Sequence, residues 1–180
     1  VVVQCDQGVG DIIMFSQLIP RLQTDCKQVI VECAERLAGM FRRCFPGVIV
    51  YGTLKDQFLT WPKNHQIDAS IHISYLGKFY LNTDQSFDRK PYITPDPDML
   101  TKWQTWLEQF PKPWTGITWR GGIQATQTHL RSIGLDDLEP ILKGKGTFFD
   151  LSYHDSAAEI SRWNIDHQTQ IVKPPISVKD

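Results

Sequence analysis

The chain has 180 residues, of which 41% are hydrophobic and 22% are charged, and its formal net charge at neutral pH is -1. This composition is typical of a globular protein with room for one large or two small domains. It gives no basic field for nucleic acid, and no apolar run approaches the ~18 residues that a membrane-spanning helix needs.

The first part of the chain alternates between strand patterns and helical patterns. Short apolar runs predict strands at residues 1–5, 28–33, 48–51 and 67–73. Helical patterns lie between or after them, at residues 10–22, 34–44 and 74–80. This alternation predicts an α/β fold, with a Rossmann-like parallel sheet, helices on both of its faces and right-handed connections.

The remaining residues predict a linker and a second α/β unit. Residues 82–97 are polar and rich in proline, and the helix predicted at 98–110 carries an apolar stripe of Trp103, Trp106, Leu107 and Phe110. We interpret this stripe as a packing face between two lobes, with a sugar-stacking platform as the alternative. A second, incomplete Rossmann-like unit then follows, with strands predicted at 115–119 and 147–153 and helices at 135–142 and 156–163.

The most informative stretch joins the first strand to the first helix. Gly8 and Gly10 form a glycine-rich turn after the strand, and Asp11 opens the helix. The helix dipole stabilises a carboxylate at that position, and the carboxylate competes with phosphate for the same backbone amides. We therefore interpret Asp11 as a base that faces a neutral hydroxyl, with an idle helix-terminal aspartate as the alternative. The two glycines are expected to permit positive φ and the close approach of a ligand.

Several segments, in order along the chain, resemble one family of enzymes. They are the Gly-Val-Gly-Asp turn at 8–11, Phe-Pro-Gly-Val at 45–48, Ser-Tyr-Leu-Gly at 74–77, Pro-Tyr-Ile at 91–93, Gly-Ile-Thr-Trp-Arg-Gly-Gly at 116–122 and Arg-Ser-Ile at 131–133. Together they resemble glycosyltransferases of the two-Rossmann (GT-B) architecture. The likeness is greatest to the ADP-heptose:lipopolysaccharide heptosyltransferase-like group and its relatives that follow tetratricopeptide repeats.

This resemblance implies an inverting transfer of a sugar from a nucleotide-sugar to an acceptor hydroxyl, without a cofactor. The implied acceptor is a glycan, a lipid-linked sugar or a protein. Asp11 matches the family's base, and Arg131 lies where the family presents a Lys or Arg to the donor diphosphate. Arg120 is a second candidate for the diphosphate, and Thr126, Thr128 and His129 lie in the same loop. A solvated loop arginine is the plain alternative for Arg131.

The resemblance also implies a domain order. Residues 1–95 correspond to an acceptor-side domain, 96–113 to a linker helix and 114–180 to part of a donor-side domain. The chain begins on a strand and lacks the family's later Asp-Thr-x-x-x-His-Leu segment, so we expect a fragment of a longer protein, one in which tetratricopeptide repeats can precede these residues. An incomplete second sheet also predicts a homo-oligomer and weak binding of nucleotide-sugars.

Cysteine and histidine give little sign of a metal centre. Cys5 and Cys33 fall on predicted buried strands, so we interpret the four cysteines as reduced structural thiols, with a disulfide or a metal site as alternatives. The five histidines lack the spacing of a zinc site. We therefore expect no metal and a cytoplasmic location.

Two other classes of function remain open. A nicotinamide-dependent Rossmann protein would use the glycine-rich turn and Glu32, which ends the second strand where a ribose-binding acid is expected. Against this, Ile13 occupies the position of the third glycine, and Asp11 would lie beside the pyrophosphate. The non-enzymatic alternative is a Rossmann-like binding or scaffold domain.

Overall fold

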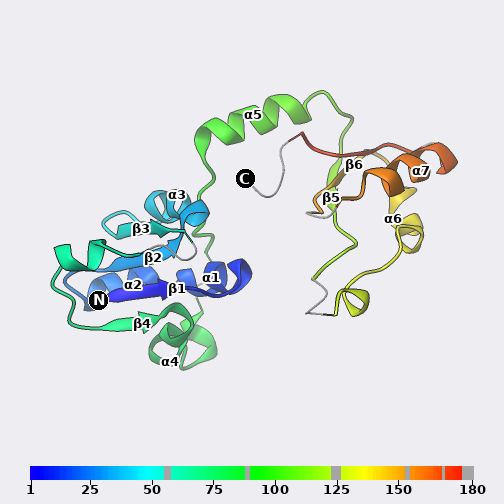
Figure 1. Ribbon diagram of the computed structural model, residues 1–180. Helices are drawn as coiled ribbons and strands as arrows, with labels where there is room; N and C mark the ends of the chain where they lie inside the picture. The colour runs from blue at the N-terminus through cyan, green and yellow to red at the C-terminus, as the bar shows by residue number, and fades with distance from the viewer. Residues whose placement is uncertain (55–57, 88–89, 123–126, 153–154, 168, 176–180) are drawn as a thin grey trace. The chain divides into compact units, whose positions relative to one another are not determined.

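Figure 1 shows a computed structural model of the chain, which describes residues 1–54, 58–87, 90–122, 127–152, 155–167 and 169–175. The chain divides into two compact units, Val1–Met99 and Leu100–Asp180. Each unit has its own parallel sheet and its own hydrophobic core. The predicted α/β fold with Rossmann-like alternation is confirmed.

Four strands form the sheet of the first unit. They are β1 (Val2–Cys5), β2 (Ile30–Ala34), β3 (Ile49–Thr53) and β4 (Ser70–His72), in the order β3-β2-β1-β4 and all parallel. Gln4 of β1 lies opposite Glu32 of β2 on one side and His72 of β4 on the other. The carboxyl ends of these strands therefore meet at one edge of the sheet, where open α/β sheets place ligands.

Two helices replace the single helix predicted at 10–22. They are α1 (Val9–Ser16) and α2 (Ile19–Asp25), and Pro20 lies in the first turn of α2. Proline lacks the N–H that the interior of a helix requires, but the first turn leaves such groups without intrahelical partners. Pro20 therefore favours the start of a new helix, and this is the physical reason why two helices form instead of one.

The α-helices of this unit pack on one face of the sheet. Side chains of α1, α2 and α3 (Glu35–Cys44), including Ile12, Leu22 and Phe41, share a core with Val3 and Val31. Leu76 of α4 (Leu76–Tyr80) and Ile73 of the 3-10 helix η2 (Ile73–Tyr75) join the same core. Successive right-handed crossovers from β1 to β2 to β3 run in one direction, so their helices lie on the same face.

The opposite face carries an aromatic cluster instead of an α-helix in the described residues, so the expectation of helices on both faces is wrong. Trp61 of η1 (Trp61–Asn64) packs on Val2 and Ile30. The Trp61 ring stacks on Tyr51, with ring centroids 4.6 Å apart, and the Tyr51 hydroxyl lies 2.7 Å from Nε2 of His65. The polar row of Gln4, Glu32 and His72 lies on this less covered face, because alternate residues of a strand point to opposite faces.

Described residues of the predicted linker, which include η3 (Asp84–Ser86), are attached to the first unit by side-chain hydrogen bonds. Arg21 donates to the carbonyl oxygens of Tyr80 and Ser86. Arg43 donates through Nε to the carbonyl of Thr94 at 2.9 Å and pairs with Asp96. These contacts explain why the first unit extends as far as Met99.

The second unit has a three-stranded parallel sheet in the order β5-β6-β7. Its strands are β5 (Trp114–Ile117), β6 (Thr147–Asp150) and β7 (Ile171–Val172). After β5, its described helices are η5 (Thr128–Leu130), η6 (Asp136–Leu138), α6 (Glu139–Leu142) and α7 (Ala157–His167). Ile160 and Trp163 of α7 pack with Ile117 and Phe148 in its core. The expectation of only two strands is wrong, because β7 is a third strand of this sheet. The sequence did not reveal β7, since two residues are too few to produce a periodic pattern.

The aromatic stripe lies on α5 (Pro97–Leu107) and the turn that follows it. Trp106 and Phe110 both contact Phe149 of β6, with ring centroids 5.3 Å apart in each pair. These two aromatics therefore pack on the sheet of their own unit, and the place of the stripe between two lobes stays a prediction. Among the residues described, no helix combines the length and apolar character needed to cross a membrane.

Candidate functional site

The glycine-rich turn places Asp11 in the first turn of α1, directly after the carboxyl end of β1. Asp11 is exposed, and the helix that carries it is held against the sheet by Ile12, which is buried. The predicted position of Asp11 is confirmed, and its catalytic role stays a prediction.

The two glycines of the turn differ from what the sequence suggested. Gly8 has φ -57°, and Gly10 lies inside α1, so neither uses the left-handed region that was expected of them. A Cβ on Gly10 would have no atom within 4 Å, and one on Gly8 would lie 3.5 Å from Oδ2 of Asp11. Their small size leaves open space beside Asp11.

We expect Gly10→Ala to raise the stability of the fold by up to about 1 kcal/mol, because alanine favours the helix and the site has room for its methyl group. Gly146→Ala is the opposite control. Gly146 has φ +103°, and its Cβ would lie 2.1 Å from the carbonyl oxygen of Pro113, so we expect a loss of more than about 1 kcal/mol. Urea unfolding of both variants tests the pair, and a destabilised Gly10→Ala would contradict the structure of the turn.

A hydrogen-bonded group that the sequence did not reveal lies at the carboxyl ends of β1 and β4. Nε2 of His72 bonds to a carboxylate oxygen of Asp6. Nδ1 of the same ring accepts the backbone N–H of Ser74 at 3.3 Å and lies 2.7 Å from the Ser74 hydroxyl. This pattern assigns the ring proton of a neutral His72 to Nε2, where it is donated to Asp6. The contact connects β4 to the residue before the glycine-rich turn.

Glu32 lies with Asp6 in a pocket of about 420 Å³ at the ends of β1, β2 and β3. Gln4, Cys5, Cys33, Ala34, Thr53 and Leu54 complete its lining. Burial raises the pKa of the Glu32 carboxyl, and the nearby Asp6 carboxylate raises it further. Two carboxylates in one pocket repel phosphate and suit hydroxyl groups, which donate hydrogen bonds to them.

The raised pKa of Glu32 gives a titration with a defined sign. The folded chain binds this proton more tightly than the unfolded chain, so the contribution to stability is present at low pH. It is lost as the pH rises from the ordinary glutamate pKa through the raised value. Carboxyl NMR should show Glu32 titrating above an ordinary glutamate, and Asp6→Asn should lower its pKa only in part, because burial is the larger cause. An ordinary pKa in the unsubstituted chain would contradict this environment.

The cysteines lining this pocket have no sign of reactivity. Cys5 and Cys33 are buried, register-matched neighbours on β1 and β2, and all four cysteines are free thiols. Burial raises the pKa of each of these two thiols to about 12. Since the thiolate is the reactive form, both side chains serve as core residues, in agreement with the interpretation from the sequence.

The second unit brings Arg120 against an acidic partner. The chain leaves β5 through Trp119, which is buried, and Arg120, which is partly exposed. Oε2 of Glu159, in the first turn of α7, accepts hydrogen bonds from Nε and Nη2 of Arg120 and from Nε1 of Trp119. The charge of Arg120 is therefore compensated within the unit.

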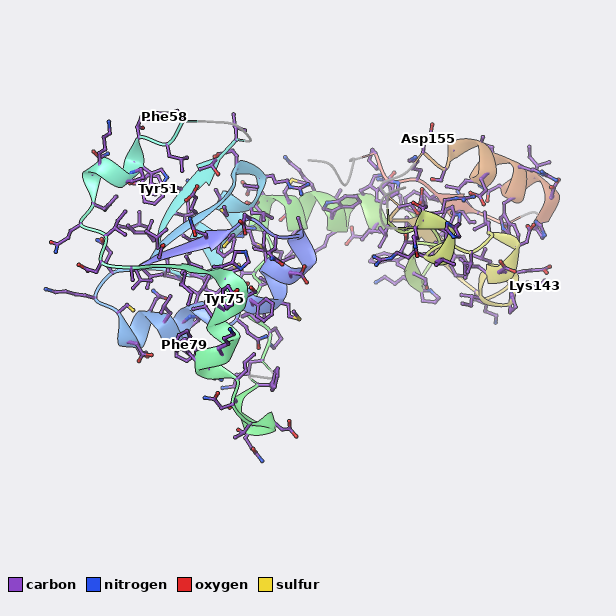
Figure 2. All side chains as sticks on the ribbon, turned by 60° about the horizontal axis from the view of Figure 1, so that its bottom comes forward. Tyr51, Phe58, Tyr75, Phe79, Lys143 and Asp155 are labelled. Carbon is purple, nitrogen blue, oxygen red and sulfur yellow. The ribbon has the colours of Figure 1, made fainter. Side chains whose placement is uncertain are left out.

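These residues border a pocket of about 700 Å³. Its lining is Arg120, Thr128, Asp155, Ala158, Glu159 and Arg162. Asp155 lies just before α7, where Figure 2 labels it. Two arginines, the Thr128 hydroxyl and the first turn of a helix are groups that bind phosphate oxygens. The pocket therefore combines cations that suit phosphate with carboxylates that compete for them.

The other predicted loop residues have different surroundings. The loop returns beside β5, because the Gly121 N–H donates to the Ser132 hydroxyl at 3.2 Å and the Ile133 N–H to the Trp119 carbonyl at 2.9 Å. Arg131 and His129 are exposed, whereas Thr128 is partly buried. Thr126 lies outside the described residues. The structure thus places Arg120 and Thr128 in one pocket, and Arg131 is not among the described residues that line it.

Within the described part of the chain, no three histidine, cysteine or acidic side chains are grouped so that they could hold a metal ion. Comparisons with known protein families, with curated proteins and with solved structures find no match to this chain. The features of the described residues that bear on function are therefore the two pockets and the exposed Asp11 carboxylate.

Proposed function

We propose that the chain is a glycosyltransferase-like protein that transfers a sugar from a nucleotide-sugar to an acceptor hydroxyl with inversion. The observation that supports this most is the exposed Asp11 carboxylate in the first turn of α1, beside the open space left by Gly8 and Gly10. A hydroxyl that enters there meets a hydrogen-bond acceptor and no nearby side chain at Gly10. The resemblance of the Gly-Val-Gly-Asp turn to the GT-B family supports the same role.

In this proposal Asp11 is the general base. Its carboxylate takes the proton of the acceptor hydroxyl while the hydroxyl oxygen attacks the anomeric carbon of the donor sugar. The bond from that carbon to the diphosphate oxygen breaks on the opposite face, so the configuration inverts. The nucleoside diphosphate leaves with the bonding electron pair, and Asp11 later releases the proton to water.

The second unit is proposed to bind the donor diphosphate. Negative charge builds up on the diphosphate as it leaves, and Arg120, Arg162 and the Thr128 hydroxyl can stabilise that charge from the 700 Å³ pocket. Arg131 is a further cation for the same group, on the strength of the family resemblance. Its exposed side chain has the reach and freedom that this role requires.

A binding or scaffold role is the second candidate. The pairing of Arg120 with Glu159 supports it, because a compensated arginine is a weak phosphate ligand. The nicotinamide alternative expected Glu32 at the end of the second strand, but Glu32 is the third residue of β2 (Ile30–Ala34). Asp6 and Asp11 also add negative charge around the turn where a pyrophosphate would bind.

Thermal-shift titration with a panel of nucleotide-sugars, NAD and NADP separates these functions. The proposal predicts a rise in melting temperature with at least one nucleotide-sugar. A shift with NAD alone would favour the oxidoreductase. No shift with any of these compounds, at concentrations of about 10 mM, would favour the scaffold, because the expected dissociation constants are on the order of millimolar.

A further inference from the structure

Glu159 occupies the edge of Arg120 that phosphate would use. Its Oε2 atom lies 2.9 Å from Nη2 and 3.1 Å from Nε of Arg120. These two nitrogens form one of the paired donor edges through which a guanidinium binds a carboxylate or phosphate group. The same Oε2 accepts the indole N–H of Trp119 at 3.0 Å, so the carboxylate is also anchored to a buried side chain.

The other cations near this pocket are paired more loosely. Arg162 lies 3.6 Å from Asp166, and Lys173 lies 3.8 Å from Asp155. The carboxylates of both pairs are more than half exposed, whereas the Glu159 side chain is only 28% exposed. Exposed ion pairs are weak and screened by salt. Of these three carboxylates, Glu159 therefore restrains an arginine of the pocket most strongly.

We infer that Glu159 is an internal competitor for the anion site of Arg120, and that it sets the affinity of this pocket for a diphosphate. A phosphate group placed at the Nε–Nη2 edge must replace the Glu159 carboxylate there. The indole N–H of Trp119 keeps a bond to Glu159 after the exchange, so the displaced carboxylate is not left without a donor. The inference rests on the proposed function only in naming a diphosphate as the anion.

The location of Glu159 determines how strongly its carboxylate and an incoming phosphate compete for Arg120. The first turn of α7 stabilises negative charge, and it favours the Glu159 carboxylate and an incoming phosphate alike. An anion that offers several oxygens can bind the arginine edge and the Thr128 hydroxyl together, whereas the carboxylate has one oxygen at the arginine. The pocket therefore selects against small anions with few oxygens and admits a diphosphate that bridges its walls.

The test is a calorimetric titration of the chain with inorganic pyrophosphate. Glu159→Gln removes the competing charge and keeps an oxygen that can accept the Trp119 N–H. We expect it to bind pyrophosphate about tenfold more tightly than the unsubstituted chain, because one unit charge is lost close to the ligand. Adding Arg120→Gln to Glu159→Gln should abolish that gain.

Asp166→Asn is the matched control, since it removes the same charge from the same helix outside the pocket lining. We expect its affinity for pyrophosphate to change less than about twofold, because the pair that it breaks is exposed. Thermal melting of each variant, in the absence of ligand, checks that the fold is retained.

Unchanged or weaker binding by Glu159→Gln would overturn the inference, and so would an equal gain in Asp166→Asn or the absence of binding in every variant. Binding of pyrophosphate that strengthens as expected, with no response to any nucleotide-sugar, would leave the inference standing and reject the proposed function. The two results are therefore distinguishable.

Discussion

Replacement of Asp11 by Asn is expected to lower sugar transfer by the complete protein by about 10²–10⁴-fold, because asparagine keeps the size of the side chain and removes the base. The fold should be retained, since Asp11 is exposed and its neighbour Ile12 supplies the buried contact of this turn. The rate of nucleoside diphosphate release, measured with donor and acceptor at saturation, reports the loss in kcat.

Asp68→Asn is a suitable comparison, because Asp68 is an exposed aspartate of the same unit, on the chain that leads into β4. It should leave the rate within a factor of about two, as expected for a surface substitution remote from the base. Full activity in Asp11→Asn would show that Asp11 is an idle helix-terminal residue. The proposal would then need another base, and the Asp6–His72 pair at the carboxyl ends of β1 and β4 has that chemistry.

The largest expected effect on stability comes from Phe41→Ala. Phe41 is fully buried in the core of the first unit, and its ring lies 5.7 Å from that of Phe45. Truncation removes apolar contacts and leaves a cavity between α3 and the sheet, so we expect a loss of about 3–5 kcal/mol. Urea unfolding followed by circular dichroism measures this loss.

Phe58→Ala makes the same chemical change on the surface of the same unit, at the residue labelled in Figure 2. Phe58 is 79% exposed. We expect a change within about 0.5 kcal/mol. Similar losses for the two variants would mean that the core of the first unit is not formed as described.

Sequence patterns predicted the described elements best where the chain is strongly periodic. The strands that became β1, β2 and β3 and the helix that became α3 lie within a few residues of their predicted positions. Two differences have local causes, because Pro20 divides one predicted helix and β7 is too short to show a pattern. Which face of the sheet the α-helices cover depends on the order of the strands, and the periodicity of a sequence does not reveal that order.

The candidate site was predictable only where its residues are close in the sequence. The position of Asp11 follows from a strand, a glycine-rich turn and a helix in succession. The Asp6–His72 and Arg120–Glu159 pairs join residues far apart in the chain, and a single sequence contains no signal for such contacts. Their one common sign is that Asp6, His72 and Arg120 lie at or just after the carboxyl ends of parallel strands.

The most direct test of the proposed function is an NMR titration of the isotope-labelled chain with nucleotide-sugars and, separately, with NAD. The account predicts that a nucleotide-sugar shifts the amide resonances of Gly121, Thr128 and Ala158 around the pocket of the second unit, with an affinity on the order of millimolar. Shifts caused by NAD at Gly8, Gly10 and Glu32, with no response to any nucleotide-sugar, would contradict the glycosyltransferase proposal.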